Sequence, residues 1–279
     1  MTLRFTKMHG TGNDFVVIDA TRTPFRPTPE LLLRLTDRRF GVGCDQVLVA
    51  EAPDAPDVDF NYRIFNPDGS EVGQCGNGSR CLAHFLRAQG LTAQRRIRVR
   101  TLSRVLELQV LDDGRVRVNM GPPGLEPAEV PYTAPARQRW YTLPLPGGES
   151  ARFAAVSMGN PHAVLRVDDA DTAPVADLGP LLQAQPQFPQ GVNVGFLQIE
   201  DSAHARLRVY ERGAGETLAC GSGACAAVVA GRLWGELGPR VDVAVRGGML
   251  TLEWEGEGRP VWMTGPAETV YTGELQWPK

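Results

Sequence analysis

Lysine is almost absent from this chain. Lys7 and Lys279 are the only lysines among 29 basic residues, so the other 27 are arginine. Enzymes that use pyridoxal phosphate hold this cofactor through a lysine Schiff base. With one lysine beside the N-terminal strand and the other at the last position, the sequence gives that class of enzyme little support.

Long apolar runs are also missing, and we expect no secretory leader. The longest apolar candidate, at 226–234, is interrupted by Gly231 and Arg232 and stays far short of the roughly 18 residues of a membrane helix. The N-terminal segment MTLRFTKMHG has no apolar core and no small-residue cleavage site. We therefore expect a cytoplasmic protein without a membrane partner. The formal net charge of −3 and the dispersed arginines also predict no nucleic-acid partner.

Motifs for metals, nucleotides and dithiol redox chemistry are missing as well. The four histidines and five cysteines form no C-x-x-C or H-x-x-x-H spacing. No P-loop is present, and no G-x-G-x-x-G follows a strand in a βαβ setting. An odd number of cysteines in a chain that we expect to lack a leader indicates free thiols. We expect no metal and no cofactor.

An internal repeat is the most informative feature that is present. The segment FNPDGSEVGQCGNGSRC around Cys75 matches YERGAGETLACGSGAC around Cys220, and the two cysteines lie 145 residues apart. At the same offset Glu71 matches Glu216, and both copies run into an apolar helical stretch. Repetition at a fixed offset indicates one structural unit used twice.

Two further echoes follow the same order. GNDFVV, which starts at Gly12, resembles GNPHAV, which starts at Gly159, at an offset of 147. GCDQVLV, with Gln46, is matched more weakly by GVNVGFLQI, with Asn193. Chance similarity of glycine-rich loops is a poor explanation for three echoes in one order, so we expect two similar halves.

Short alternating runs predict a protein made mostly of strands. Strands are expected at 15–19, 47–50, 59–65, 97–100, 106–111, 115–120, 154–157, 163–167, 192–199, 205–210, 241–245, 250–254 and 261–265. Helices are expected at 29–38, 77–89, 174–184 and 222–235, and the proline-rich stretch 121–148 forms the crossing between halves, with one short strand inside it. The predicted class is α/β (α+β), with two domains that each curve a mainly antiparallel sheet around a central helix.

Each repeated cysteine stands just before a Gly-x-Gly turn that opens a helix. The free N–H groups of a helix N-terminus favour anions, so each turn can hold a substrate carboxylate. The same position can lower the pKa of a thiol toward neutrality. A site between the halves would then hold one carboxylate and place one sulfur on each side of the neighbouring carbon.

Two groups of one kind on opposite faces of a carbon suit inversion of a stereocentre. One removes the proton as a base while the other returns a proton as an acid. The matched motifs single out Cys75 and Cys220 for this role. Cys44, Cys81 and Cys225 are expected to be small buried hydrophobes.

The ordered motifs resemble those of diaminopimelate epimerases. They include NPDGS followed by CGNGSR at Cys75, HGTGNDF near the start, and SMGNPH, which ends at His162. VYERGAGET and CGSG at Cys220 complete the set, and the likeness covers nearly all of the chain.

The resemblance implies two pseudo-symmetric domains with the last strand returning to the first: 1–119 plus 266–279, and 120–265. It implies interconversion of L,L- and meso-diaminopimelate on the route to lysine and bacterial cell-wall peptide, without metal or pyridoxal phosphate. It also implies a homodimer.

The resemblance assigns roles position by position. Cys75 and Cys220 match the proton-transfer residues, and His162 and Glu211 match residues that tune the thiols. The groups that bind the reacting carboxylate match Gly76, Asn77, Gly221 and Ser222. Glu211 also matches the residue that lies near the reacting amino group. The polar set that holds the substrate, mostly its distal end, matches Asn13, Gln46, Asn66, Asn160, Asn193 and Arg212. Arginine suits a distal carboxylate because it can pair with it through two parallel hydrogen bonds.

Other interpretations stay open at this point. A proline or hydroxyproline racemase would share the architecture, but that group usually has histidine after Cys-Gly and a D-R-S-P-C-G-T-G second motif. Asn77 and the run Glu211-Arg212-Gly213 point away from it. A relative that keeps the fold without two-thiol chemistry, or a non-catalytic redox pair of thiols, is a further alternative.

Overall fold

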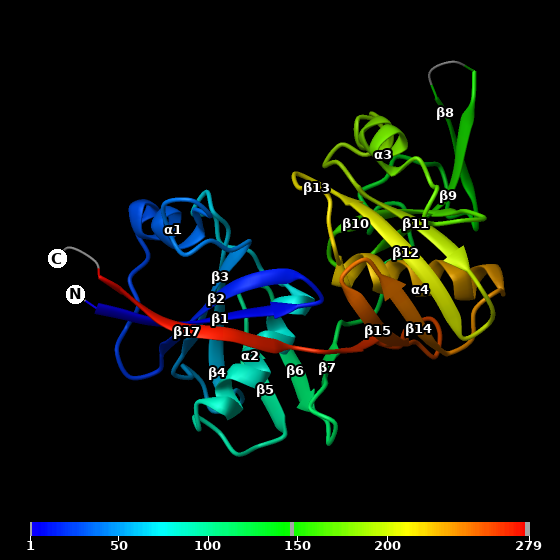
Figure 1. Cartoon of the computed structure of the whole chain (residues 1–279). Helices are drawn as coiled ribbons and strands as arrows, with labels where there is room; N and C mark the ends of the chain where they lie inside the picture. The colour runs from blue at the N-terminus through cyan, green and yellow to red at the C-terminus, as the bar shows by residue number, and fades with distance from the viewer. Residues whose placement is uncertain (1, 146–147, 277–279) are drawn as a thin grey trace. The chain divides into compact units, whose positions relative to one another are not determined.

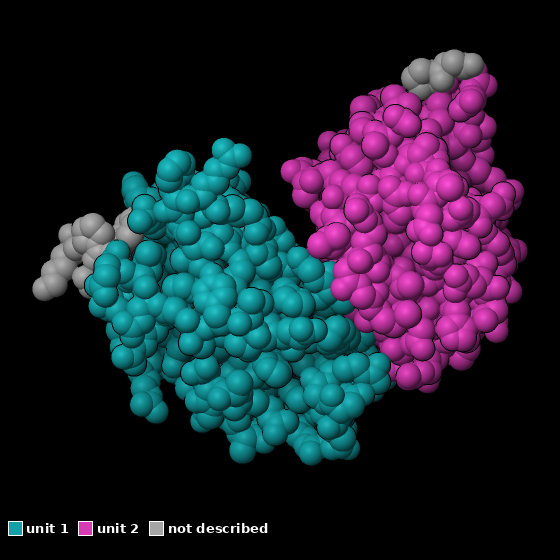
Figure 2. Space-filling model, in the orientation of Figure 1, with its two compact units in different colours: residues 1–119, 264–279 teal, residues 120–263 magenta. Residues whose placement is uncertain are grey.

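The structure is a computed structural model that describes residues 2–145 and 148–276 (Figure 1). The chain separates into two compact units, which Figure 2 colours separately. Unit 1 comprises residues 1–119 and 264–279, and unit 2 comprises residues 120–263. The sequence-based division placed the second boundary after residue 265, at the end of strand β16 (Trp262–Gly265), whereas the boundary between the units falls within that strand.

Unit 1 is a mixed sheet with helix α2 against it. Its strands are β1 (Thr2–Gly10), β2 (Asn13–Ala20), β3 (Gln46–Glu51), β4 (Phe60–Phe65), β5 (Arg96–Arg100), β6 (Val105–Val110), β7 (Val116–Asn119) and β17 (Glu268–Gln276). Its helices are α1 (Pro29–Thr36) and α2 (Gly76–Ala88). The last strand, β17, pairs antiparallel with β1.

Unit 2 repeats this plan. Its strands are β8 (Tyr141–Pro144), β9 (Ser150–Ser157), β10 (Pro161–Arg166), β11 (Asn193–Ile199), β12 (His204–Glu211), β13 (Gly215–Glu216), β14 (Arg240–Val245) and β15 (Gly248–Glu253). Its helices are α3 (Val175–Gln183) and α4 (Gly221–Trp234). Strand β8 is the short strand expected inside the crossing segment.

The order of strand pairings is the same in both units. From β1 to β6 neighbouring strands pair antiparallel, parallel, antiparallel, parallel and antiparallel. From β9 through β10, β11, β12 and β14 to β15 the series is identical. Even the register repeats, because Phe15 faces Gln46 and His162 faces Asn193, each 147 residues later. The predicted class and duplication are confirmed, and each mainly antiparallel sheet also contains parallel pairs.

The central helices are where the sequence predicted them, within one or two residues. Helix α2 packs against β1, β2, β3, β6 and β7, and α4 packs against β9, β10, β11, β12 and β15. Almost all of α4 is buried, and it ends at Gly235, whose left-handed φ of 81° terminates a helix readily. The second glycine of the first motif has a packing reason, because a Cβ on Gly78 would lie 2.5 Å from the Tyr62 hydroxyl. Glycine at this position therefore lets helix α2 approach the sheet closely.

An ion pair is also duplicated. Arg63 on β4 donates to both carboxylate oxygens of Glu71, at 3.1 and 2.8 Å. Arg208 on β12 does the same to Glu216, at 2.7 and 3.0 Å, and both residues lie 145 positions later. Each pair ties the segment that leads to a repeated cysteine back to its own sheet. Bidentate arginine–carboxylate pairs fix geometry as well as charge.

Candidate active site: two cysteine-capped helices

The first cysteine residue caps helix α2 and is partly exposed. Cys75 has an extended backbone at the N-cap, where its sulfur accepts from the Gly78 amide at 3.4 Å. The Cys75 thiol in turn reaches Asn13 Oδ1 at 3.8 Å, and Asn13 also accepts from Asn77 Nδ2 at 3.3 Å. Two of the predicted substrate-binding residues of unit 1 therefore lie beside this sulfur.

Two other predicted residues of unit 1 form a pair of their own, and Gly76 is the first residue of α2. Gln46, at the start of β3, donates through Nε2 to Asn66 Oδ1 at 2.8 Å. Asn66 follows β4, donates to Ser70 Oγ at 3.0 Å and accepts from the Gly69 amide through its backbone oxygen. The turn that holds Asn66 therefore has the local Asn and Asp hydrogen bonds expected of such a sequence.

The second cysteine residue caps helix α4 and is buried. Cys220 is 4% exposed, and its sulfur lies 3.6 Å from Ser222 Oγ. Burial and then the charge and hydrogen bond of Glu211 raise the pKa of the Cys220 thiol well above its ordinary value. The expected lowering of the thiol pKa by the helix N-terminus is wrong for Cys220, because desolvation and a neighbouring carboxylate outweigh it.

A directed series of contacts joins His162 to Cys220. His162 is 1% exposed, and burial, with the charge of Arg212, lowers its pKa to about 3, so the ring is neutral at pH 7. Its Nε2 lies 3.1 Å from Asn160 Oδ1, and because an amide oxygen only accepts, Nε2 donates there. Asn160 Nδ2 then donates to Ser222 Oγ at 3.4 Å. His162 is thus connected to the sulfur through two side chains.

The remaining predicted residues of unit 2 gather at the end of β12. Glu211 accepts from Thr217 Oγ1 at 2.5 Å, so a hydroxyl that the motifs did not single out helps to hold this carboxylate. Asn193 Oδ1 accepts from the Arg212 backbone amide at 2.9 Å. The Arg212 side chain is exposed and donates to the Gln190 backbone oxygen at 2.6 Å.

Three cysteines lie away from these contacts, as expected. Cys44, Cys81 and Cys225 are 3% exposed or less. Desolvation by burial raises the pKa of Cys44 to about 12 and also raises the pKa of Cys81. Thiols in such surroundings pack like small hydrophobic groups and are poor bases.

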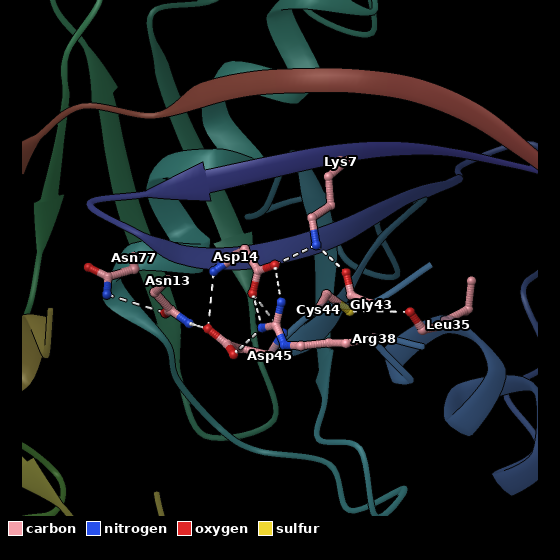
Figure 3. Close-up of polar contacts among 9 residues, drawn as sticks. All are labelled: Lys7, Asn13, Asp14, Leu35, Arg38, Gly43, Cys44, Asp45 and Asn77. Carbon is pink, nitrogen blue, oxygen red and sulfur yellow. Dashed lines mark hydrogen bonds and ion pairs between the residues drawn. The ribbon is translucent and has the colours of Figure 1, made fainter. Parts of the chain in front are cut away.

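Lys7 is held by structural contacts. Its ammonium is buried and contacts the Asp14 carboxylate and the Gly43 backbone oxygen (Figure 3). Within residues 2–145 and 148–276, no cluster of three His, Cys, Asp or Glu side chains is arranged to hold a metal ion. None of the helices in the same part of the chain is long and apolar enough to cross a membrane.

Comparison with known proteins decides the family. The family model described as diaminopimelate epimerase matches residues 5–126 and 154–270. The chain belongs to the diaminopimelate epimerase family. It is 56% identical over 278 residues to the diaminopimelate epimerase of Alkalilimnicola ehrlichii, with 99% of both chains covered. It is 58% identical over 275 residues to that of Aromatoleum aromaticum, again with 99% of both covered.

Solved structures outside the family share the fold. A hydroxyproline epimerase from Agrobacterium vitis, with bound trans-4-hydroxy-L-proline, aligns with a TM-score of 0.73 over 98% of this chain and 92% of that one. The sequence identity is only 17%, so this likeness concerns the fold alone. Members of the diaminopimelate epimerase family are isomerases, and the chain is therefore an enzyme of that class.

Proposed function

We propose that this chain interconverts L,L- and meso-diaminopimelate, using Cys75 and Cys220 on opposite faces of one α-carbon. The observation that carries the proposal is the duplicated helix N-terminus, each copy capped by a cysteine, in a chain of this family. One sulfur takes the α-proton as a base, and the other delivers a proton to the opposite face as an acid. In the reverse direction the two exchange roles.

The raised pKa of Cys220 supports its role as the acid in one direction. Burial and Glu211 favour the protonated thiol, which can deliver its proton to the carbanion. When Cys220 acts as the base in the other direction, its proton must leave, and the adjacent Glu211 carboxylate is placed to accept it. His162, through Asn160 and Ser222, orients the hydroxyl beside the same sulfur.

The carbanion beside a carboxylate needs strong stabilisation. The first backbone amides of α2 and α4, at Gly76, Asn77, Gly221 and Ser222, supply donors and the positive ends of two helix dipoles. These groups bind the reacting carboxylate in the proposal. Asn13, Gln46, Asn66, Asn160, Asn193 and Arg212 hold the rest of the substrate, with Arg212 pairing with the distal carboxylate. Glu211 lies near the reacting ammonium.

Isotope exchange tests the proposal directly. The protein is incubated with L,L-diaminopimelate in D₂O without added cofactor, with EDTA and hydroxylamine in parallel samples. We expect meso product with deuterium at one α-carbon, at the same rate in all samples. L-proline and trans-4-hydroxy-L-proline serve as competing substrates. Exchange with either of them and none with diaminopimelate would overturn the proposal in favour of the racemase alternative.

A further inference from the structure

Two side-chain amides in unit 1 lie in a hydrogen-bonded series of four side chains, in which every donor points the same way along the series. Arg80 Nη1 donates to Asn77 Oδ1 at 2.9 Å, Asn77 Nδ2 donates to Asn13 Oδ1 at 3.3 Å, and Asn13 Nδ2 donates to Asp45 Oδ2 at 2.7 Å. Figure 3 shows Asn13 between Asp45 and Asn77. The side chains come from α2, from the start of β2 and from the segment before β3.

The two side chains at the ends of this hydrogen-bonded series, Arg80 and Asp45, decide the direction of both amides. A guanidinium only donates, so the atom of Asn77 that faces Arg80 is its oxygen. A carboxylate only accepts, so the atom of Asn13 that faces Asp45 is its nitrogen. Reversing Asn13 would place two donors face to face at Asn77 and two acceptors face to face at Asp45. Each end therefore excludes the flipped amide.

Both ends are themselves well held. Arg80 is fully buried and also donates to the Pro266 backbone oxygen and to Thr11 Oγ1, at 3.0 and 3.2 Å. Arg38 Nη2 donates to Asp45 Oδ1 at 2.7 Å, which leaves Asp45 Oδ2 turned to Asn13 (Figure 3).

Asp14 ties Arg38 in place in turn. Arg38 donates to both Asp14 oxygens, at 3.0 and 2.6 Å. Burial opposes ionisation of Asp14, but Arg38 and Lys7 outweigh it and lower its pKa to about 2. The Asp14 carboxylate, which holds Arg38 beside Asp45, is therefore charged throughout the physiological pH range.

We propose that Asp45 and Arg80 are positioning residues, which fix the amide directions of Asn13 and Asn77 so that a carbonyl oxygen faces the Cys75 sulfur. An acceptor at this place suits the S–H group of Cys75 and a substrate ammonium. A donor would suit a thiolate or a carboxylate instead. The amide direction thus sets which charge is accepted beside the first cysteine. The consequence for turnover rests on the proposed function, whereas the geometry does not.

A double-mutant cycle tests whether Asp45 acts through Asn13. Asp45→Asn replaces an acceptor-only group with an amide of nearly the same shape, so one of the two constraints on the direction of Asn13 is lost and only the contact with Asn77 opposes its rotation. We expect kcat/KM for diaminopimelate to fall about tenfold, the equivalent of one oriented hydrogen bond. In an Asn13→Ala background the same change should cost less than about twofold, because the group it acts through is gone.

The control is an ion pair of similar exposure in the same unit. Asp57 pairs with Arg100 at 3.0 Å, and the side chains are 53% and 38% exposed, against 44% and 57% for Asp45 and Arg38. Asp57→Asn should leave kcat/KM within about twofold of wild type in both backgrounds. An equal loss from Asp45→Asn with and without Asn13 would overturn the proposal.

A second measurement needs no substrate. Alkylation of Cys75 by iodoacetamide, followed by mass spectrometry of its peptide, should become about threefold or more faster in Asp45→Asn, because a rotated Asn13 can donate to the thiolate. The change should vanish in the Asn13→Ala background. If wild type fails to turn over diaminopimelate, the proposed function is wrong, and this cycle still decides the positioning role.

A milder variant covers the case in which Asp45→Asn does not fold. Arg38→Gln keeps Asp45 but removes the guanidinium that holds it, at a side chain that is 57% exposed, so Asp45 can turn away from Asn13. We expect a smaller acceleration of alkylation that again depends on Asn13. No acceleration, or one that persists without Asn13, would contradict the inference.

Discussion

The two units place different groups beside the cysteine in the same frame. Both begin their central helix directly after the cysteine and brace the preceding segment with a bidentate arginine–glutamate pair. In unit 1 the sulfur is partly exposed and faces the amide of Asn13. In unit 2 the sulfur is buried beside the carboxylate of Glu211. Duplication has kept the backbone and changed the surroundings of the thiol.

Loss of either sulfur is the largest expected effect. Cys75→Ala and Cys220→Ala should each reduce epimerisation by about a thousandfold or more, because proton removal and proton return each need a titrating group. The same substitution at Cys81 or Cys225, buried within α2 and α4, is the matched control and should keep activity within a few fold. The rate is measured as meso product formed from the L,L substrate, with circular dichroism to verify folding. Full activity of Cys75→Ala or of Cys220→Ala would rule out the two-cysteine mechanism.

Glu211→Gln should make the surroundings of Cys220 more like those of Cys75, because it removes the carboxylate charge beside the Cys220 sulfur. Without the carboxylate charge the pKa of Cys220 falls, although burial still holds it up. We expect faster alkylation of Cys220 at pH 8 and a loss of activity of about tenfold to a hundredfold. Glu236→Gln is the control, since Glu236 forms a partly exposed pair with Arg166 in the same unit. Unchanged alkylation at Cys220 would show that Glu211 does not set its proton affinity.

The duplicated arginines should differ in the stability that they contribute. Arg208 also donates to backbone oxygens of the segment before α3, at Ala170, Asp171 and Ala173. The further contacts of Arg63 are a distant Glu51, at 3.7 Å, and the Phe65 ring, whose centroid lies 4.7 Å from the guanidinium carbon. Arg63→Met should cost about 1 kcal/mol of unfolding free energy, the usual value for a partly exposed pair. Arg208→Met should cost about 2 to 3 kcal/mol, because it also leaves carbonyl groups without their donor.

Hydrogen exchange locates these effects. We expect faster exchange in 66–75 for the first variant and in 212–219 for the second, with thermal melts giving the totals. Arg95→Met, in an exposed pair with Asp112, is the control and should change neither segment. Equal costs for the two arginines would mean that the extra contacts of Arg208 contribute nothing.

The sequence predicts the duplicated frame well because that frame is local. The four helices and most strands follow from periodicity and from glycine motifs at their ends. The strand patterns did not predict β1, because it buries Thr6 and Lys7 and so breaks the alternation. They did not predict β17 either, because most of it is exposed, and only the resemblance implied this last strand. The arginine pair was missed although Arg63 and Arg208 have the same 145-residue offset as the cysteines.

The surroundings of the thiols could not be read from motifs in the same way. The hydrogen-bonded series from Arg80 to Asp45 joins side chains from α2, β2 and the segment before β3, and no local sequence pattern predicts that these side chains come together. The proton affinity of Cys220 depends on its burial and on Glu211, which lies nine residues earlier at the end of β12. Motif spacing finds the two sulfurs, but only tertiary structure shows that they differ.

A final difference concerns one register position. His162 of unit 2 corresponds to Phe15 of unit 1, and both are fully buried. The pKa of His162 is about 3 in the folded protein and 6.5 ordinarily, so below pH 6.5 the unfolded chain binds a proton that the folded chain does not. Stability therefore falls as the pH drops from 6.5 toward 3. The expected loss between pH 7 and pH 5 is about 2 kcal/mol.

His162→Phe places the unit 1 residue in unit 2 and should remove this loss. Urea unfolding at pH 7, 6 and 5 measures it, and tryptophan fluorescence reports mainly unit 2, since four of the five tryptophans lie in 120–263. His204→Gln is the control with the opposite sign: exposed Asp201 raises the pKa of His204, so its contribution is present below pH 6.5 and lost as the pH rises. Because Asp14 titrates near pH 2, it does not interfere in this range. An unchanged loss in His162→Phe would mean that other groups cause the acid sensitivity of unit 2.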